Sequence, residues 1–154
     1  MKVLIFSDSH GNVSPMLVAI DRESPNMILH CGDNAKDCDA VAAVYPNIPL
    51  RIVSGNCDTF SKEEREDEFI ISGKRIYMTH GHLHNVKMGL KSIVNDALLR
   101  EVDLLIFGHT HIAHHDTSDD LTIINPGSIG YPEHTYAALE IKDGIMTCTI
   151  KKVL

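Results

Sequence analysis

The sequence predicts an α/β fold: a two-sheet β-sandwich core flanked by helices. Short apolar segments alternate with segments of helical periodicity from residue 3 to residue 107, a pattern typical of a sheet with helices packed outside it. The last third of the chain has strand patterns only, which suggests a second sheet stacked on the first. Since 154 residues suit one core and no linker composition interrupts them, residues 1–154 are expected to form one domain.

The composition argues against several classes of protein. The net charge is −7 and no cluster of Lys and Arg stands out, so the chain gives no strong nucleic-acid signal. No apolar run approaches the roughly 20 residues that cross a bilayer, and the first residues do not resemble a signal peptide. The 4 cysteines lack C-x-x-C spacing and are expected to be free thiols. We therefore expect a cytoplasmic protein without membrane partners.

Three apolar segments are predicted strands, residues 3–6, 27–29 and 50–53, and the first is expected to be buried on both faces. Two helices are expected between them. Ser14 and Pro15 form an N-cap and first-turn pair that starts the first helix, which extends to about residue 22. Asp37 is expected to cap the second helix, and Pro46 ends it.

The middle of the chain predicts a hairpin across Gly73-Lys74, with strands at residues 68–72 and 75–79. A helix follows, because apolar residues recur at the spacing of one helix face: Leu90, Ile93, Val94, Ala97 and Leu98. The segments after it are predicted strands, the last two joined by an Asp-Gly turn: residues 104–107, 112–117, 121–124, 135–141 and 145–151.

Metal-binding residue types follow five of the predicted strands. The carboxyl ends of strands in an open α/β sheet meet at one edge, where ligands bind. Residues i and i+2 of an extended segment point to the same side, so Asp8 and His10 can reach one ion. Five such strand ends would place these side chains around one pocket: Asp8, His10, Asp33, Asn56, Asp58, His80, His109 and His111.

Without Asp58, this set offers seven oxygen and nitrogen donors, too many for one tetrahedral zinc ion. Two divalent ions about 3.5–4 Å apart that share a bridging carboxylate would use all of them. Imidazole, carboxylate and amide donors without a thiolate suit Mn, Fe or Zn. Any one of these motifs alone is ordinary in a turn, but their recurrence at consecutive strand ends predicts a metal site.

The chain carries an ordered series of motifs that resembles the signature of the calcineurin-like metallophosphoesterases: Asp8-x-His10, Gly32-Asp33, Gly55-Asn56-Cys57-Asp58, His80-Gly81-His82 and Gly108-His109-x-His111. The compact size resembles their small bacterial and archaeal phosphodiesterase branch. The resemblance runs from residue 3 to about residue 130, and the segment 125–128, Asn-Pro-Gly-Ser, also fits that branch. The family's two-sheet sandwich flanked by helices agrees with the fold predicted from the residues.

The resemblance implies a metal-dependent enzyme that hydrolyses a small phosphodiester by attack of a metal-activated hydroxide. Its cofactors would be two divalent ions, Mn²⁺ first, with Fe, Zn, Ni and Mg as alternatives. One ion would be held by Asp8, His10, Asp33 and His111. The other would be held by Asp33, Asn56, His80 and His109, with Asp33 as the bridge. Assembly into a homo-oligomer is left open.

Catalytic roles are implied for Asn56, Cys57 and Asp58. Many relatives have histidine at the position of Cys57, where it protonates the leaving oxygen, and the small phosphodiesterase branch has cysteine there. Asp58 would orient a proton-transfer group, form hydrogen bonds within the site or cap a turn. His82 and His84 follow a predicted ligand. His82 would touch substrate, orient a ligand or lie in a solvated loop.

The same fold also resembles the retromer scaffold subunit, which works through protein contacts and whose metal residues are partly degenerate. The alternative function is therefore a protein-interaction module with a vestigial metal site. Because all seven ligand positions are filled in this chain, the sequence favours the enzyme. His30, which ends a predicted strand, is expected to pack in the interior or to support the site.

Overall fold

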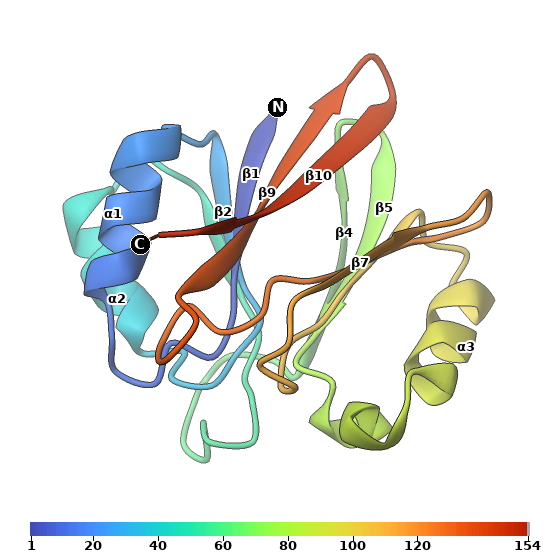
Figure 1. Cartoon of the computed structure of the whole chain (residues 1–154), viewed down its shortest axis with the longest axis horizontal. Coiled ribbons are helices and arrows are strands. Elements are labelled where there is room, and N and C mark those ends of the chain that lie inside the picture. Colours follow the sequence, from blue (N-terminus) through green and yellow to red (C-terminus); the bar gives the residue numbers. More distant parts are fainter. Residues whose placement is uncertain (154) are drawn as a thin grey trace.

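The computed structural model of the chain describes residues 1–153, which form two mixed five-stranded sheets (Figure 1). The first sheet has the strand order β10-β9-β1-β2-β3, with β1 (Lys2–Phe6), β2 (Met27–His30), β3 (Leu50–Ile52), β9 (Thr135–Lys142) and β10 (Ile145–Lys152). The second has the order β4-β5-β6-β8-β7, with β4 (Glu66–Ile71), β5 (Lys74–Thr79), β6 (Leu104–Ile106), β7 (His114–Thr117) and β8 (Thr122–Asn125). The predicted α/β sandwich of two sheets is confirmed.

The expectation that the last third of the chain builds the second sheet is right for β6, β7 and β8 but wrong for the C-terminal hairpin, which belongs to the first sheet. β9 pairs antiparallel with β1, with Leu4 opposite Ala138, and β10 pairs with the other side of β9. The second sheet instead begins with the β4–β5 hairpin. The side chains of β9 are buried on both faces from Thr135 to Leu139, which suits a strand in the interior of a sheet.

The apolar core between the sheets receives side chains from both. The first sheet contributes Val3, Ile5, Leu29, Ala137 and Leu139, and the second contributes Phe69, Ile76, Met78, Leu104 and Ile106. Burying one side chain of the Val, Leu, Ile, Phe or Met type contributes about 1.5–3 kcal/mol. This layer therefore holds the two sheets in one relative position, which matters because both sheets carry predicted metal ligands.

Helices cover the outer faces of the sandwich (Figure 1). α1 (Ser14–Glu23) and α2 (Asp37–Val44) pack on the first sheet, and α3 (Lys91–Leu99) packs on the second. The predicted helix face of α3 is confirmed at Ile93 and Ala97, which are buried against β5 and β6, but Leu98 is exposed. Among the described residues, no helix has the length and apolar composition needed to cross a membrane.

The two predicted helix caps are wrong. Val13 takes the N-cap position of α1 (φ −77°, ψ −31°) without a side-chain cap, and Ser14 is the first residue of the helix. Asp37 lies inside α2 and makes no cap. Its carboxylate is used elsewhere, since it accepts hydrogen bonds from the Ser9 hydroxyl (2.7 Å) and the Gly11 N–H (2.8 Å).

The β4–β5 hairpin turns one residue earlier than predicted. Ile71 pairs with Lys74 across Ser72-Gly73. Both turn residues have positive φ, 49° and 80°, the backbone of a tight two-residue hairpin turn. The chain after β5 forms two short 3-10 helices that hydrophobic periodicity does not reveal: η1 (His82–His84) and η2 (Val86–Met88).

Candidate metal centre

Loops that follow β1, β2, β3, β5 and β6 meet at one edge of the sandwich, between the two sheets (Figure 1). Six of the seven predicted ligands lie there in two clusters, each with donor atoms within 4.8 Å of one another: Asp8, His10 and His111 in the first, and Asp33, His80 and His109 in the second. The seventh, Asn56, joins the second cluster, with its Oδ1 atom 3.1 Å from His80 Nε2.

The first cluster surrounds a buried carboxylate. Asp8 is fully buried, and its Oδ2 atom accepts hydrogen bonds from the Ser7 hydroxyl and the His109 N–H (3.0 Å). Its Oδ1 atom has no hydrogen-bond partner among the described residues, although His111 Nε2 lies 3.1 Å away. His10 Nε2 lies 3.3 Å from His111 Nε2. Because a buried carboxylate oxygen without a partner is costly, a divalent cation among these three side chains fits the cluster.

The second cluster contains His80, whose tautomer is set by a hydrogen bond to a backbone carbonyl group. The Cys31 carbonyl oxygen can only accept, so His80 Nδ1 carries the proton that it receives (2.7 Å), and Nε2 presents its lone pair to the site. That Nε2 lies 3.4 Å from Asp33 Oδ1, 3.1 Å from Asn56 Oδ1 and 3.2 Å from His109 Nδ1. Imidazole, carboxylate and amide donors this close together suit Mn, Fe or Zn.

Asp33 lies between the two clusters. Its Oδ1 atom is 3.4 Å from His80 Nε2, and its Oδ2 atom is 3.9 Å from His10 Nε2. The residue is 3% exposed, and Oδ1 also accepts a hydrogen bond from the Cys57 N–H (2.9 Å). A carboxylate whose two oxygens face different clusters has the geometry that a bridging ligand requires.

The backbone at the site is strained. Positive φ angles between 47° and 67° occur at five predicted ligands: Asp8, His10, Asp33, His109 and His111. Few residues other than glycine adopt this conformation, and such strain collects at functional sites. Two glycines make the room that these loops need. A Cβ atom on Gly55 would collide with the Asp33 carboxylate, and one on Gly108 would collide with the Ser7 side chain.

Asp58 fastens the loops around the Asp33 carboxylate. Its Oδ2 atom accepts hydrogen bonds from the N–H groups of Asp33 (2.9 Å) and Gly55 (2.8 Å), and its Oδ1 atom accepts one from the Ala35 N–H (2.9 Å). Within residues 1–153, no hydrogen bond joins the Asp58 carboxylate to the Cys57 thiol. Of the three roles expected for Asp58, these contacts support hydrogen bonding within the site.

A buried histidine supports the loop that follows β1. Ser9 lies between two predicted ligands, and its hydroxyl donates to Asp37 Oδ2 (2.7 Å). His30 Nδ1 accepts a hydrogen bond from the Gly32 N–H (3.2 Å), so Nε2 carries the proton and donates to Ser9 Oγ (3.2 Å). Burial lowers the pKa of His30 to about 4, which keeps the ring neutral. His30 thus packs in the interior and also supports the site, as expected.

Burial and neighbouring charges set the protonation of the site. Burial alone would raise the pKa of Asp33, but the nearby His80 ring and a hydrogen bond from the Cys57 N–H hold it well below its usual range. Burial disfavours charged His80, yet Asp33 and Asp8 outweigh it and raise the His80 pKa. Burial, followed by the nearby His80, lowers the pKa of His109 to about 4. Burial and then Asp33 raise the pKa of the Cys57 thiol.

The segment after β8 ties two of the site loops together. Asn125 Nδ2 donates to the Gly108 carbonyl oxygen (2.9 Å) and to Thr110 Oγ1 (3.0 Å). The Ser128 hydroxyl donates to the Asp8 carbonyl oxygen (2.9 Å). The Asn-Pro-Gly-Ser pattern visible in the sequence is the signal for this support, although its partners emerge only in the fold.

His82 and His84 occupy different surroundings. The His82 ring packs against His80 and His109, with ring centroids 5.4 and 6.1 Å away, so it borders the second cluster. His84 Nε2 lies 3.0 Å from Asp96 Oδ2 and joins η1 to α3. Of these two, only His82 lies at the site.

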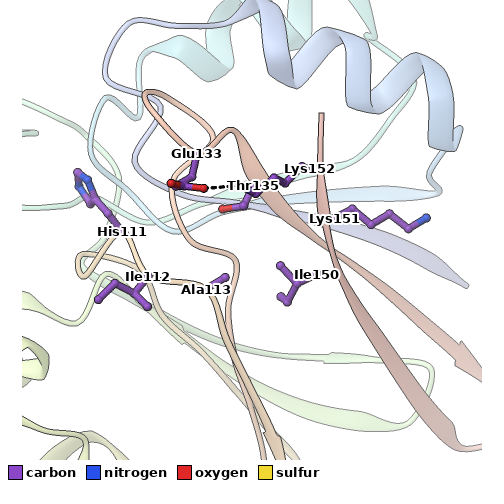
Figure 2. Close-up of a pocket in the computed structure, with 8 residues that line it drawn as sticks. All are labelled: His111, Ile112, Ala113, Glu133, Thr135, Ile150, Lys151 and Lys152. Atoms are coloured by element: carbon purple, nitrogen blue, oxygen red, sulfur yellow. Dashed lines mark hydrogen bonds and ion pairs between the residues drawn. The ribbon is translucent and has the colours of Figure 1, made fainter. Parts of the chain in front are cut away.

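A hollow of about 470 Å³ opens beside the first cluster, and we call it the His111 hollow (Figure 2). Its lining residues are His111, Ile112, Ala113, Glu133, Thr135, Ile150, Lys151 and Lys152. Both lysines are engaged by carboxylates, Lys152 by Glu133 and Lys151 by Glu23 (2.6 Å). The rest of the wall is mainly aliphatic.

Comparison with known proteins gives a family for this arrangement. Residues 1–144 match the family described as the calcineurin-like phosphoesterase superfamily domain. The chain is 34% identical to the probable metallophosphoesterase YsnB of Bacillus subtilis, with 96% of this chain and 88% of that protein covered. It is 30% identical to the phosphodiesterase MJ0936 of Methanocaldococcus jannaschii, with 82% of this chain and 83% of that protein covered.

Solved structures share the fold. An uncharacterised Streptococcus pneumoniae protein, named a predicted phosphoesterase, has a TM-score of 0.83 at 24% identity and covers 99% of this chain and 89% of its own. Wild-type Vps29 from Entamoeba histolytica, complexed with zinc, has a TM-score of 0.76 at 21% identity, with 100% of both chains covered. The match over residues 1–144 and the identity with YsnB show that this chain belongs to the calcineurin-like phosphoesterase superfamily.

Proposed function

We propose that the chain is a phosphodiesterase that uses two divalent metal ions, with Mn²⁺ as the expected metal. The observation that carries this proposal is the position of Asp33 between two donor clusters. One ion would be held by Asp8, His10, Asp33 and His111, and the other by Asp33, Asn56, His80 and His109. Membership of the family supports a phosphoesterase, and the relative named as a phosphodiesterase supports a diester substrate.

Divalent ions bound in such a site neutralise phosphate charge and make hydroxide available near neutral pH. The residues of the chain hold the geometry for this chemistry. Asp58 fixes the Asp33 loop through three backbone N–H groups. The proton on His80 Nδ1 keeps Nε2 free to bind. Residues 1–154 would act as one catalytic domain, because both sheets supply ligands.

Cys57 is the proposed proton donor to the leaving oxygen. It is exposed at the open side of the site, and burial and Asp33 raise the pKa of its thiol, which favours the protonated form. Asn56 Nδ2 lies 3.5 Å from Cys57 Sγ, so the amide that would bind metal through Oδ1 also contacts the donor. A thiol donates less readily than an imidazolium near neutrality, so the proposal favours esters of acidic alcohols.

The test is to reconstitute the protein with Mn²⁺ and measure hydrolysis of bis(p-nitrophenyl) phosphate and of p-nitrophenyl phosphate, together with elemental analysis. We expect two ions per chain and diester hydrolysis that chelation removes and Mn²⁺ restores. The likeness to the Vps29 structures lends some weight to the alternative, a protein-interaction module with a vestigial metal site. A protein that binds two ions and hydrolyses neither ester would support that alternative. The presence of a donor side chain at all seven predicted positions supports the enzyme.

A further inference from the structure

We propose that a second hollow, beside Cys57, binds a planar aromatic arm of the substrate. This Cys57 hollow has a volume of about 470 Å³ and is lined by Asn34, Lys36, Cys57, Asp58, Thr59, Phe60 and Ser61. The proposal rests on the proposed phosphodiesterase function and adds the class of ester that the site selects. That class is an anionic phosphodiester with an aryl or nucleobase-bearing arm.

The Cys57 hollow begins where the substrate phosphate would lie. Cys57 Sγ lies within 4.8 Å of donor atoms of His10 and Asp33, one from each of the two clusters. The Cys57 N–H also donates to the Asp33 carboxylate (2.9 Å). An ester arm that extends from a phosphate at this position therefore passes directly into the Cys57 hollow, whose volume suits a small ligand group.

Phe60 gives the wall an aromatic surface. It is 98% exposed, more than any other large apolar residue of the described chain, so both faces of its ring are free. Isolated exposed apolar residues are common on protein surfaces. Met88 and Leu99 are similar in exposure, 91% and 84%, but neither lines a hollow beside the metal centre. Stacking of a ligand ring on an exposed aromatic side chain is tolerant of sequence and substituent.

Lys36 adds a cation to the same wall. Lys2, Lys151 and Lys152 are engaged by glutamates, whereas within residues 1–153 Lys36 takes part in no ion pair and is exposed. In a chain with a net charge of −7, a free ammonium group beside the site attracts an anionic substrate. The Asp58 carboxylate in the wall is already satisfied by three N–H groups.

The His111 hollow lacks this combination. Its lysines face Glu133 and Glu23, and its apolar surface comes from aliphatic residues, mainly Ile112 and Ile150 (Figure 2). It can contain an arm of suitable size but offers no aromatic ring to stack on. A third hollow contains Phe107, but that ring is buried. Selection for an aromatic arm is therefore assigned to the Cys57 hollow, whose Phe60 ring is exposed.

The test uses two inert probes, dibenzylphosphinate and dibutylphosphinate, in which carbon replaces both ester oxygens of a phosphodiester. Their dissociation constants are measured by calorimetry on the Mn²⁺-reconstituted protein. We expect Phe60→Ala to reduce the preference for the dibenzyl probe about ten-fold, the effect of one stacked ring. Phe60→Tyr keeps the ring and should keep the preference. Leu99→Ala removes an exposed side chain on α3 and should change neither constant.

The cation is tested separately. Lys36→Gln should weaken binding of both probes by a similar factor, and added salt should reduce that factor. Lys142→Gln is the control, because Lys142 lies at the end of β9, opposite the N-terminal end of β1 and away from the site.

An aromatic preference that survives Phe60→Ala, or that is lost only in Ile112→Ala, would overturn the assignment. Because the probes are not hydrolysed, loss of the preference in Phe60→Ala supports the hollow even if diester turnover fails. If diesters are hydrolysed but neither binding nor turnover depends on Phe60, the proposed phosphodiesterase function stands and the proposed role of the Cys57 hollow is rejected.

Discussion

Asp33 directs its two carboxylate oxygens toward different histidines, Oδ1 toward His80 and Oδ2 toward His10. Asp33→Asn removes the charge shared by both clusters, so it should weaken the binding of both ions together. His10→Ala removes a donor of the first cluster alone and should chiefly empty one site. Metal counting on the two purified variants, with wild type as reference, compares them. Two ions bound by Asp33→Asn as tightly as by wild type would contradict the bridging role.

Cys57, the proposed proton donor, is expected to determine how the reaction depends on the leaving group. A poor proton donor leaves negative charge on the departing oxygen, so wild-type rates should fall steeply as the leaving-group pKa rises. Cys57→His introduces a group that titrates near the working pH, as general acid catalysis prefers. We expect it to flatten this dependence and to raise activity on monoesters. The measurement is a series of aryl phosphodiesters on both proteins. Wild-type rates that do not change with leaving-group pKa would show that proton donation by Cys57 does not limit the reaction.

The sequence alone could predict that the seven donor residues lie together at one site. Each of them follows an apolar strand, and the ends of these strands share one edge. The sequence could not show the positive φ at Asp8 or at His109. Nor could it show that Asp58 accepts three backbone N–H groups, since these come from two loops that meet only after folding. A local sequence pattern shows which metal-binding or hydrogen-bonding groups a residue has. The partners of those groups depend on the whole fold.

Asp58 acts at the level of the elements, because it joins the loops that follow β2 and β3. Asp58→Ala leaves three N–H groups without their acceptor and should lower the free energy of unfolding by about 2–3 kcal/mol. It should also weaken metal binding, because the Asp33 loop loses its support. Asp58→Asn keeps one acceptor oxygen and should lose less. Urea unfolding measures the first effect and metal titration the second. Asp116→Ala on exposed β7 is the control, and an equal effect there would contradict the account.

Glu23 fastens the end of α1 to the first sheet through Lys151 (2.6 Å), Tyr136 (3.0 Å) and Lys2 (3.2 Å). Burial raises its pKa, but these three hydrogen bonds lower it from 4.5 to about 2. The contribution to stability is therefore complete above the unfolded pKa of 4.5 and is lost as the pH falls toward about 2.

Glu23→Gln should cost about 2 kcal/mol at neutral pH, and the difference from wild type should vanish near the lower pKa. Urea midpoints across the acid range measure this. The exposed pair of Glu133 and Lys152 supplies the control, and Glu133→Gln should move the midpoint little at any pH. A deficit in Glu23→Gln that persists unchanged into acid would show that charge is not its cause.

Strands and helices could be predicted from apolar patterns to within one or two residues, but their partners could not. The pairing of β9 with β1 joins the two ends of the chain, and no local pattern records it. The cap predicted at Asp37 failed for a similar reason, because Ser9 and Gly11 from another loop take its carboxylate. Periodicity describes a segment and its buried face, whereas sheet order depends on long-range contacts.

The metal centre draws donors from both sheets, so bound metal should stabilise the whole sandwich. A ligand present at 100 times its dissociation constant adds about 2.7 kcal/mol to stability. His80 must be neutral to bind, and its raised pKa means that protons compete with metal as the pH falls. His109, with a pKa of about 4, is already neutral. The increase in Tm caused by Mn²⁺ should therefore shrink from about pH 8 to about pH 5. An equal increase at both ends of this range would count against histidine ligands.

β1 lies between β2 and β9, and this order constrains the newly made protein. All seven predicted ligands have been synthesised once residue 111 is added, yet β1, which leads to Asp8, keeps an open edge until β9 has followed. A chain of that length has all seven donor residues but lacks the strand that pairs with the free edge of β1. We therefore expect stable metal binding only after the C-terminal hairpin has paired with β1. A chain truncated after residue 130 would keep every donor and should lose its metal on a desalting column.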